Sequence, residues 1–173
     1  MAPAIVAYFL RIMKRWWIII ATLTLVGVLI LFGQNFSSKS PLPANLTDQA
    51  TSTVLVPITN DISVNRTTAS YNPHIKLLVF SVQVGGIRTV FSEQPTPNTF
   101  VDIPQVYDRV IEQSQEYGSF ETALGTVHLT RPRNAYGKQT AILNTRGTLL
   151  FVKPDKELSD SNWRQLFRAL TVL

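Results

Sequence analysis

The chain has 173 residues, which suffices for one ordinary domain plus an anchor and not for two full domains. The absence of cysteine excludes disulfides, a Cys-ligated zinc or iron–sulfur site, a thiol nucleophile and lipidation at a Cys. The net charge is +5, but from Gln34 onward thirteen Lys and Arg stand against eleven Asp and Glu, so a basic nucleic-acid-binding domain is not expected.

An uncharged apolar run dominates the N-terminal part of the chain. Trp16 to Gly33 is eighteen residues long, and at about 1.5 Å per helical residue it would span roughly 27 Å, close to the hydrocarbon thickness of a bilayer. A basic cluster precedes it, formed by Arg11, Lys14 and Arg15, and such charges keep an N-terminus on the cytoplasmic side. We therefore predict a short cytoplasmic or interfacial segment at 1–15 and a single transmembrane helix at 16–33 with the bilayer as its partner. The C-terminal domain would be extracytoplasmic.

Two other interpretations of this run remain open. A cleaved signal peptide has a shorter apolar stretch, about 7 to 15 residues, and ends in small residues, whereas Phe32 and Phe36 flank the exit here. A buried helix of a globular core would carry polar residues on one face, which Trp16 to Gly33 does not. An uncleaved anchor is the prediction that fits both observations.

The segment after the anchor is rich in Ser, Thr, Pro, Asn and Gln. Residues 34–52 have little to bury, and this composition is typical of a flexible tether. The folded domain is then predicted to occupy residues 53–173. Asn35, Asn45 and Asn65 each begin an N-x-S/T sequence, which would matter only in a eukaryotic secretory pathway.

Short β-type runs follow the tether. Val54 to Ile58 is predicted as an edge strand, because Pro57 lacks the N–H that a central strand needs. Lys76 to Val84 and Ile87 to Glu93 are rich in β-branched and aromatic residues and are separated by Gly85 and Gly86, a pattern that predicts a hairpin.

A helix is predicted from Ile103 to Tyr117. Asp102 would cap it, Pro104 suits its first turn and Gly118 would end it. Apolar residues recur at helical spacing along one side of this segment, with acidic and amide residues on the other, so one face should be buried.

Three more strands and a second helix complete the pattern. Thr126 to Thr130, Gln139 to Asn144 and Thr148 to Lys153 read as strands, and a helix begins after Ser159 with an apolar stripe from Trp163 to Leu170. Short connections favour antiparallel pairing. The predicted fold class is α+β: an N-terminal transmembrane helix plus a two-layer domain with a mainly antiparallel sheet of five to six strands and two helices.

Residues with catalytic chemistry are few. No nucleophile elbow, HExxH, P-loop or dinucleotide-binding spacing is present, and the two histidines, His74 and His128, are not spaced as metal ligands. Glu93, Asp102 and Asp108 would lie near one edge, where paired acids could act on glycosides or phosphates, but each has a structural explanation as strand end, helix cap or solvated helix face. We predict no catalytic residue, metal or cofactor.

The candidate binding residues lie in one loop between two predicted strands. Arg131, Arg133, Tyr136 and Lys138 occur in the sequence RPRNAYGK, which could bind a phosphate, a polyanionic wall polymer or lipid headgroups. The alternative is an ordinary solvated hairpin loop. The neighbouring sequence SEQPTPNTF from Ser92 to Phe100 could contact a partner or simply direct the chain from strand to helix.

The hairpin ending in SEQPTP, the sequence GTVHLT, the strand pair ending in TLLFVKP and the final SDxxWxxL helix form a recognisable order. In it the chain resembles small bacterial single-pass extracytoplasmic domains of unknown function and is similar to the outer sensor ends of some anti-sigma factors. About fifteen residues precede the anchor, too few for a sigma-binding domain.

The expected function is therefore an envelope domain that binds a ligand, a protein or a wall polymer, without enzymatic activity. A hydrolase or transferase acting on envelope material is one alternative. A lipid or peptide carrier with a cavity between sheet and helices is the other.

Overall fold

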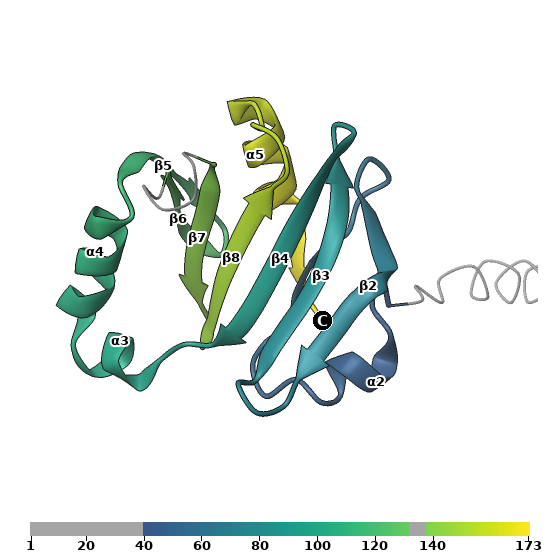
Figure 1. Cartoon of the computed structure of the whole chain (residues 1–173), viewed down its shortest axis with the longest axis horizontal. Helices are drawn as coiled ribbons and strands as arrows, with labels where there is room; N and C mark the ends of the chain where they lie inside the picture. The colour runs from purple at the N-terminus through teal and green to yellow at the C-terminus, as the bar shows by residue number, and fades with distance from the viewer. Residues whose placement is uncertain (1–39, 132–137) are drawn as a thin grey trace, which may run out of the picture. The chain divides into compact units, whose positions relative to one another are not determined.

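The computed structural model describes residues 40–131 and 138–173. Ser40–Leu173 forms one compact unit with an α+β fold (Figure 1). Its elements are α2 (Ala44–Thr47), β1 (Leu55–Pro57), β2 (Ser63–Asn72), β3 (Leu77–Val84), β4 (Ile87–Pro95), α3 (Asn98–Asp102), α4 (Pro104–Gln113), β5 (Glu116–Thr122), β6 (Gly125–Thr130), β7 (Thr140–Thr145), β8 (Thr148–Pro154), α5 (Asp160–Arg168) and β9 (Leu170–Val172).

The strands form two antiparallel sheets. The larger has seven strands in the order β2-β3-β4-β8-β7-β6-β5, and the smaller pairs β1 with β9. Antiparallel pairing was predicted, but the described residues hold nine strands and four helices, more than the five to six strands and two helices expected. The extra elements are β2, β5 and β9 and the short helices α2 and α3.

The hairpin predicted at Gly85 and Gly86 is confirmed. Strands β3 and β4 pair from Leu78 with Glu93 to Val84 with Ile87, and both glycines of the turn, Gly85 and Gly86, have positive φ. A Cβ at Gly85 would also approach the Asn162 side-chain amide to 2.8 Å, so that side chain would have to move to admit it, and the positive φ is the main reason for glycine there.

The helix predicted from Ile103 to Tyr117 is shorter in the structure. Helix α4 ends at Gln113, Gln115 adopts a φ of 56°, and the chain enters β5 at Glu116. Asp102 is not the cap, because it is the last residue of α3, and Ile103 precedes α4 without a side-chain cap. The apolar pattern of the sequence did not reveal where the helix ends. Tyr117 continues the helical spacing of apolar residues, although the backbone is already a strand at this residue.

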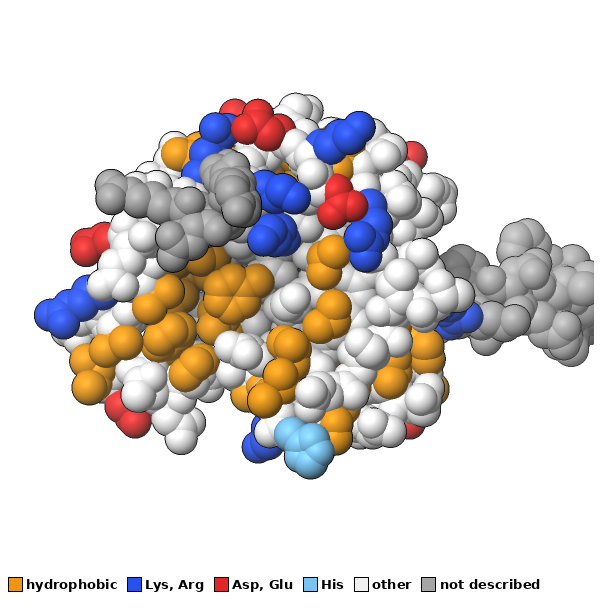
Figure 2. All heavy atoms as spheres, in the orientation of Figure 1, with side chains coloured by type: hydrophobic (Ala, Val, Ile, Leu, Met, Phe, Trp, Pro, Cys, Tyr) orange, Lys and Arg blue, Asp and Glu red, His pale blue; other side chains and the backbone are white. Residues whose placement is uncertain are grey.

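Helices pack against both faces of the large sheet, whereas the predicted domain had two layers, one sheet and one layer of helices. Alternate residues of a strand point to opposite faces, and Leu143 and Leu150 join the main core while Ile142 and Leu149 join a second, smaller cluster. Helix α5 contributes to the main core and α4 contributes Ile111 to the second cluster. Hydrophobic side chains of the α3–α4 side gather on the surface in Figure 2.

Helix α5 is formed as predicted at its start and ends earlier than predicted. The Ser159 hydroxyl accepts the Asn162 N–H at 3.3 Å, and Trp163, Leu166 and Phe167 are buried. Its last residue is Arg168, and Leu170 begins β9 instead of a further helical turn. Strand β9 pairs with β1, so the two ends of the described domain meet, and Pro57 lies at an edge as predicted.

Part of the segment assigned to the tether packs on the domain. Leu42 is fully buried and belongs to the main core, and α2 follows it. The Arg66 guanidinium on β2 donates hydrogen bonds to the carbonyl oxygens of Ser40 and Pro41. Leu42, together with the partly buried Leu46 and Ala50 that pack against the same core, brings this segment into the fold.

Candidate functional site

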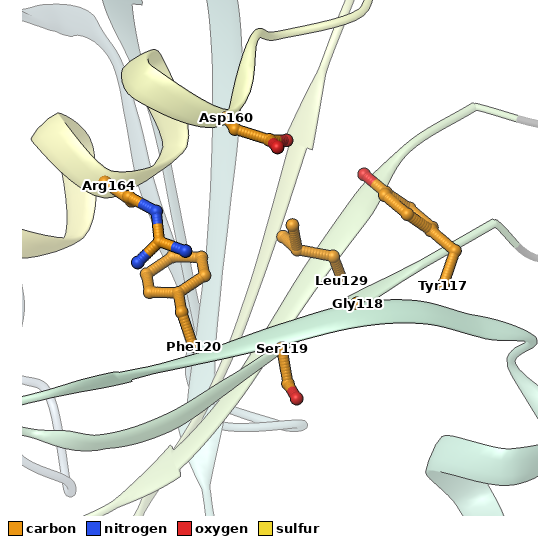
Figure 3. A pocket seen from close by; sticks show the side chains of 7 residues that line it. All are labelled: Tyr117, Gly118, Ser119, Phe120, Leu129, Asp160 and Arg164. Atoms are coloured by element: carbon orange, nitrogen blue, oxygen red, sulfur yellow. The ribbon is translucent and has the colours of Figure 1, made fainter.

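A hollow of about 110 Å³ lies between strand β5 and the first turns of α5. Strand β5 supplies one wall, Leu129 of β6 lies at the base, and α5 supplies the other wall (Figure 3). The lining residues are Tyr117, Gly118, Ser119, Phe120, Leu129, Asp160 and Arg164. Tyr117 and Asp160 face one another across Leu129, and the Ser119 side chain points away.

Strand β5 is the last strand of the seven-stranded sheet. Among the described strands it pairs with β6 alone, so its other edge has no strand beside it. The β5–β6 turn is fixed by the Thr122 hydroxyl, which donates to the Gly125 carbonyl at 2.8 Å and accepts the Leu124 N–H at 3.1 Å. This hairpin presents an open strand edge directly beside the hollow.

A bulge in β5 positions Tyr117. The β5–β6 register shifts between Glu116, opposite Thr130, and Gly118, opposite Leu129, which leaves Tyr117 without a partner in the ladder. Bulges bend a strand and re-aim a side chain. The Tyr117 ring consequently borders the hollow.

Core packing fixes the helical wall. The buried Trp163, Leu166 and Phe167 hold α5 on the sheet, and the Phe120 and Phe167 rings meet edge to face at 5.8 Å. Asp160 and Arg164 lie one turn apart on the exposed side of this helix. Both charged groups are therefore set on a rigid element beside β5.

The charges around the hollow are mixed. The Arg164 guanidinium lies 5.0 Å from the centre of the Phe120 ring, and the Arg131 guanidinium lies 4.9 Å from the centre of the Tyr117 ring. Arg131 also pairs with the Glu157 carboxylate at 3.0 Å. Burial raises the pKa of Tyr117, against the lowering effect of Arg131, so its hydroxyl is neutral and can donate or accept a hydrogen bond.

The predicted loop residues contribute only in part. Arg131 stacks on Tyr117 and so borders the hollow, whereas Lys138 is exposed and lines no part of it. Arg133 and Tyr136 lie outside the described residues. Loop composition could not identify Phe120 or Arg164, because their role depends on β5 being a strand and on its contact with α5.

The carboxylates considered for catalysis do not face one substrate. Glu93 is 1% exposed and lies inside β4 rather than at a solvated strand end, whereas Asp102 and Asp108 are exposed. Catalysis on a glycoside requires two acids that reach the same bond. This geometry offers no such pair.

His128 belongs to a small polar cluster on the opposite side of the sheet from α5. Its Nδ1 lies 2.9 Å from a Glu116 carboxylate oxygen, and its ring meets the Tyr107 ring edge to face at 5.9 Å. Burial raises the pKa of Tyr107 to about 12. Within residues 40–131 and 138–173, no group of three His, Cys, Asp or Glu is placed to hold a metal ion.

A scan against family models and searches of curated proteins and of solved structures give no match for this chain. The predicted anchor, Trp16 to Gly33, lies outside the described residues. In the part of the chain that the structure describes, no helix has the length and apolar character to cross a membrane.

Proposed function

We propose that this protein is a membrane-anchored extracytoplasmic domain of the cell envelope that binds an extended segment of a partner protein. The segment would pair with the open edge of β5 and insert one side chain into the hollow beside α5. The uncharged run from Trp16 to Gly33 supports the anchor. The edge of β5, which has no strand beside it among the described residues, lies next to the hollow and supports binding by strand addition.

The edge of β5 is the observation that carries this proposal. In strand addition, main-chain hydrogen bonds provide affinity and pockets for alternate side chains provide specificity. β5 offers both, because no strand of the described residues lies on its outer edge and its own residues line the hollow. The bulge at Tyr117 and the exposed Glu116 and Glu121 limit pairing with arbitrary strands, which is how edge strands avoid aggregation.

The size of the hollow favours one peptide side chain over a small molecule. Its volume of about 110 Å³ is well below the roughly 300 Å³ at which ordinary ligand pockets begin. Its walls combine the aromatic rings of Tyr117 and Phe120 with the charges of Asp160 and Arg164. A side chain with an apolar stem and a polar end fits this surface.

Gly118→Leu should weaken peptide binding. A Cβ added at Gly118 meets no heavy atom within 4 Å and the backbone there is not left-handed, so a leucine can be attached at this position and would occupy the hollow. Heptapeptides selected by phage display on the full-length protein should bind the variant at least tenfold more weakly by fluorescence anisotropy, a change of roughly 1.4 kcal/mol in binding free energy.

Ser119→Leu is the matched control for this variant. It adds the same side chain to the next residue of β5, but on the side that points away from the hollow. Its peptide affinity should stay within about twofold of the wild type, since the binding energy lies in the edge and the hollow. Equal affinity of the wild type and Gly118→Leu, or failure to select any peptide, would contradict the proposed mode.

The anchor makes a separate prediction. The full-length protein should remain in the membrane pellet after an alkaline wash, and a C-terminal reporter should be accessible from outside the cytoplasmic membrane. Deleting Trp16 to Gly33 should move the protein out of the pellet. Recovery of full-length protein in the cytosol, or of a mature form that begins after Gly33, would show that the run is not a permanent anchor.

A further inference from the structure

Glu93 is a buried carboxyl group with one hydrogen-bond partner. It lies in β4 with Leu78 and Leu150 opposite it on the neighbouring strands, and its side chain faces the main core. One oxygen, Oε2, accepts the Leu55 N–H at 3.1 Å. The other, Oε1, is buried without a partner among the described residues.

This hydrogen bond joins β1 to the large sheet. Among the described strands, β1 pairs in register only with β9. Besides the Glu93–Leu55 bond, the Thr148 hydroxyl donates to the Thr53 carbonyl at 2.6 Å. The apolar side chains of Leu55 and Val56 are fully buried beneath the same region. Glu93 is therefore covered by the strand that it holds.

Within the described residues, no ion pair to the Glu93 carboxylate is formed. Strands β1, β3 and β9, which surround it, contain no titratable residue. The charged residues of the other nearby elements are exposed: Asp48, Arg88, Lys153, Asp160, Arg164 and Arg168. Burial raises the pKa of Glu93 to about 8, and the Leu55 N–H opposes this only in part. The protonated carboxyl group is thus the form that the closed structure favours.

We propose that Glu93 is a proton-operated latch, which holds β1 against the sheet when protonated and releases it when ionised. Release exposes the carboxylate to water and frees the first strand of the domain, so the connection between the sheet and the N-terminal segment becomes longer. The latch is independent of peptide binding at β5.

The direction of the pH response follows from the raised pKa. A closed state that binds the proton more tightly than the open state has its full stability below the ordinary pKa of about 4.5 and loses it as pH rises through about 8. Between these values, the population of the open state should increase about tenfold per pH unit. Above pH 8 the increase should stop.

Hydrogen exchange of the full-length protein tests the latch. Between pH 5 and pH 8, after correction for intrinsic exchange rates, peptides containing Leu55 and Leu170 should lose protection about tenfold per pH unit, and at each pH they should exchange faster than peptides from β3 and β4, which exchange through unfolding of the whole domain. Glu93→Gln keeps an acceptor for the Leu55 N–H but cannot ionise, so this slope should vanish. Glu112→Gln, at an exposed position of α4, should behave as wild type. Equal slopes in wild type and Glu93→Gln would overturn the proposal.

A second measurement does not depend on how well Glu93→Gln folds. In wild-type protein labelled at the glutamate carboxyl carbon, the Glu93 resonance should titrate well above the ordinary value of about 4.5, because the closed state holds the proton. A midpoint between 4 and 5 would overturn the latch. So would equal protection of β1, β3 and β4 at each pH, because the release would then be unfolding of the whole domain.

Discussion

Truncation of Trp163 to alanine is expected to remove a large share of the stability of the domain. The Trp163 side chain is fully buried in the main core, beside Phe167 with ring centroids 6.2 Å apart, and its Nε1–H donates to the Gln139 side chain at 3.3 Å. Loss of a buried tryptophan typically costs about 3–5 kcal/mol, against a total stability of about 5–15 kcal/mol for a domain. Urea unfolding followed by circular dichroism should show a much lower midpoint.

Gln165→Ala is the matched control for this truncation. Gln165 lies on the same helix, is exposed, and makes a 3.3 Å hydrogen bond to Asp61 at the surface. Its removal should change the unfolding free energy by no more than about 0.5 kcal/mol. An unchanged midpoint in Trp163→Ala would show that α5 is not central to the core.

The best-predicted elements are those whose pattern and end signals agree. Gly85 and Gly86 separate two runs of β-branched and aromatic residues, and the hairpin forms between them. Ser159 followed by a polar first turn predicted the start of α5, and the hydroxyl caps it. Local chemistry decides both features, so no knowledge of distant contacts was required.

The missed strands depend on partners far away in the sequence. Strand β2 is rich in Thr, Ser and Asn and lacks an apolar alternation, yet it pairs with β3 through a register shift between Asn65 and Ser70. Strand β9 continues a helical stripe, but pairing with β1 takes Leu170 out of α5. Tertiary pairing overrides local preference in both.

The candidate site was missed for the same reason. Once residues near Tyr117 are assigned to a helix, no strand edge exists for α5 to flank, and the basic loop with Arg131 remains as the visible feature. The burial of Glu93 could have been predicted from its alternation with Phe91 in the same strand, since both side chains face the core. The acidic side chain instead suggested a solvated strand end.

The unfolding free energy of the wild-type protein is expected to fall as pH rises from 5 to 8. Glu93 binds its proton more tightly in the folded state, where burial raises its pKa to about 8, than in the unfolded state. The folding stability from this group is complete below the ordinary pKa of about 4.5 and is lost as pH rises through about 8. The slope should approach 1.4 kcal/mol per pH unit, or roughly 4 kcal/mol over this range.

Glu93→Gln isolates this contribution from those of all other titrating groups. The variant retains a hydrogen-bond acceptor for Leu55 but has no proton to lose, so the difference between the two proteins in urea unfolding should change steadily from pH 5 to pH 8 and level off above it. As pH rises, Glu93→Gln should become more stable relative to the wild type. To fold, only the wild type must then either bury an ionised carboxylate or take up a proton at low proton concentration. Parallel stability curves would mean that water or a rearranged neighbour solvates Glu93 in the folded protein, and that its burial beneath β1 does not control its ionisation.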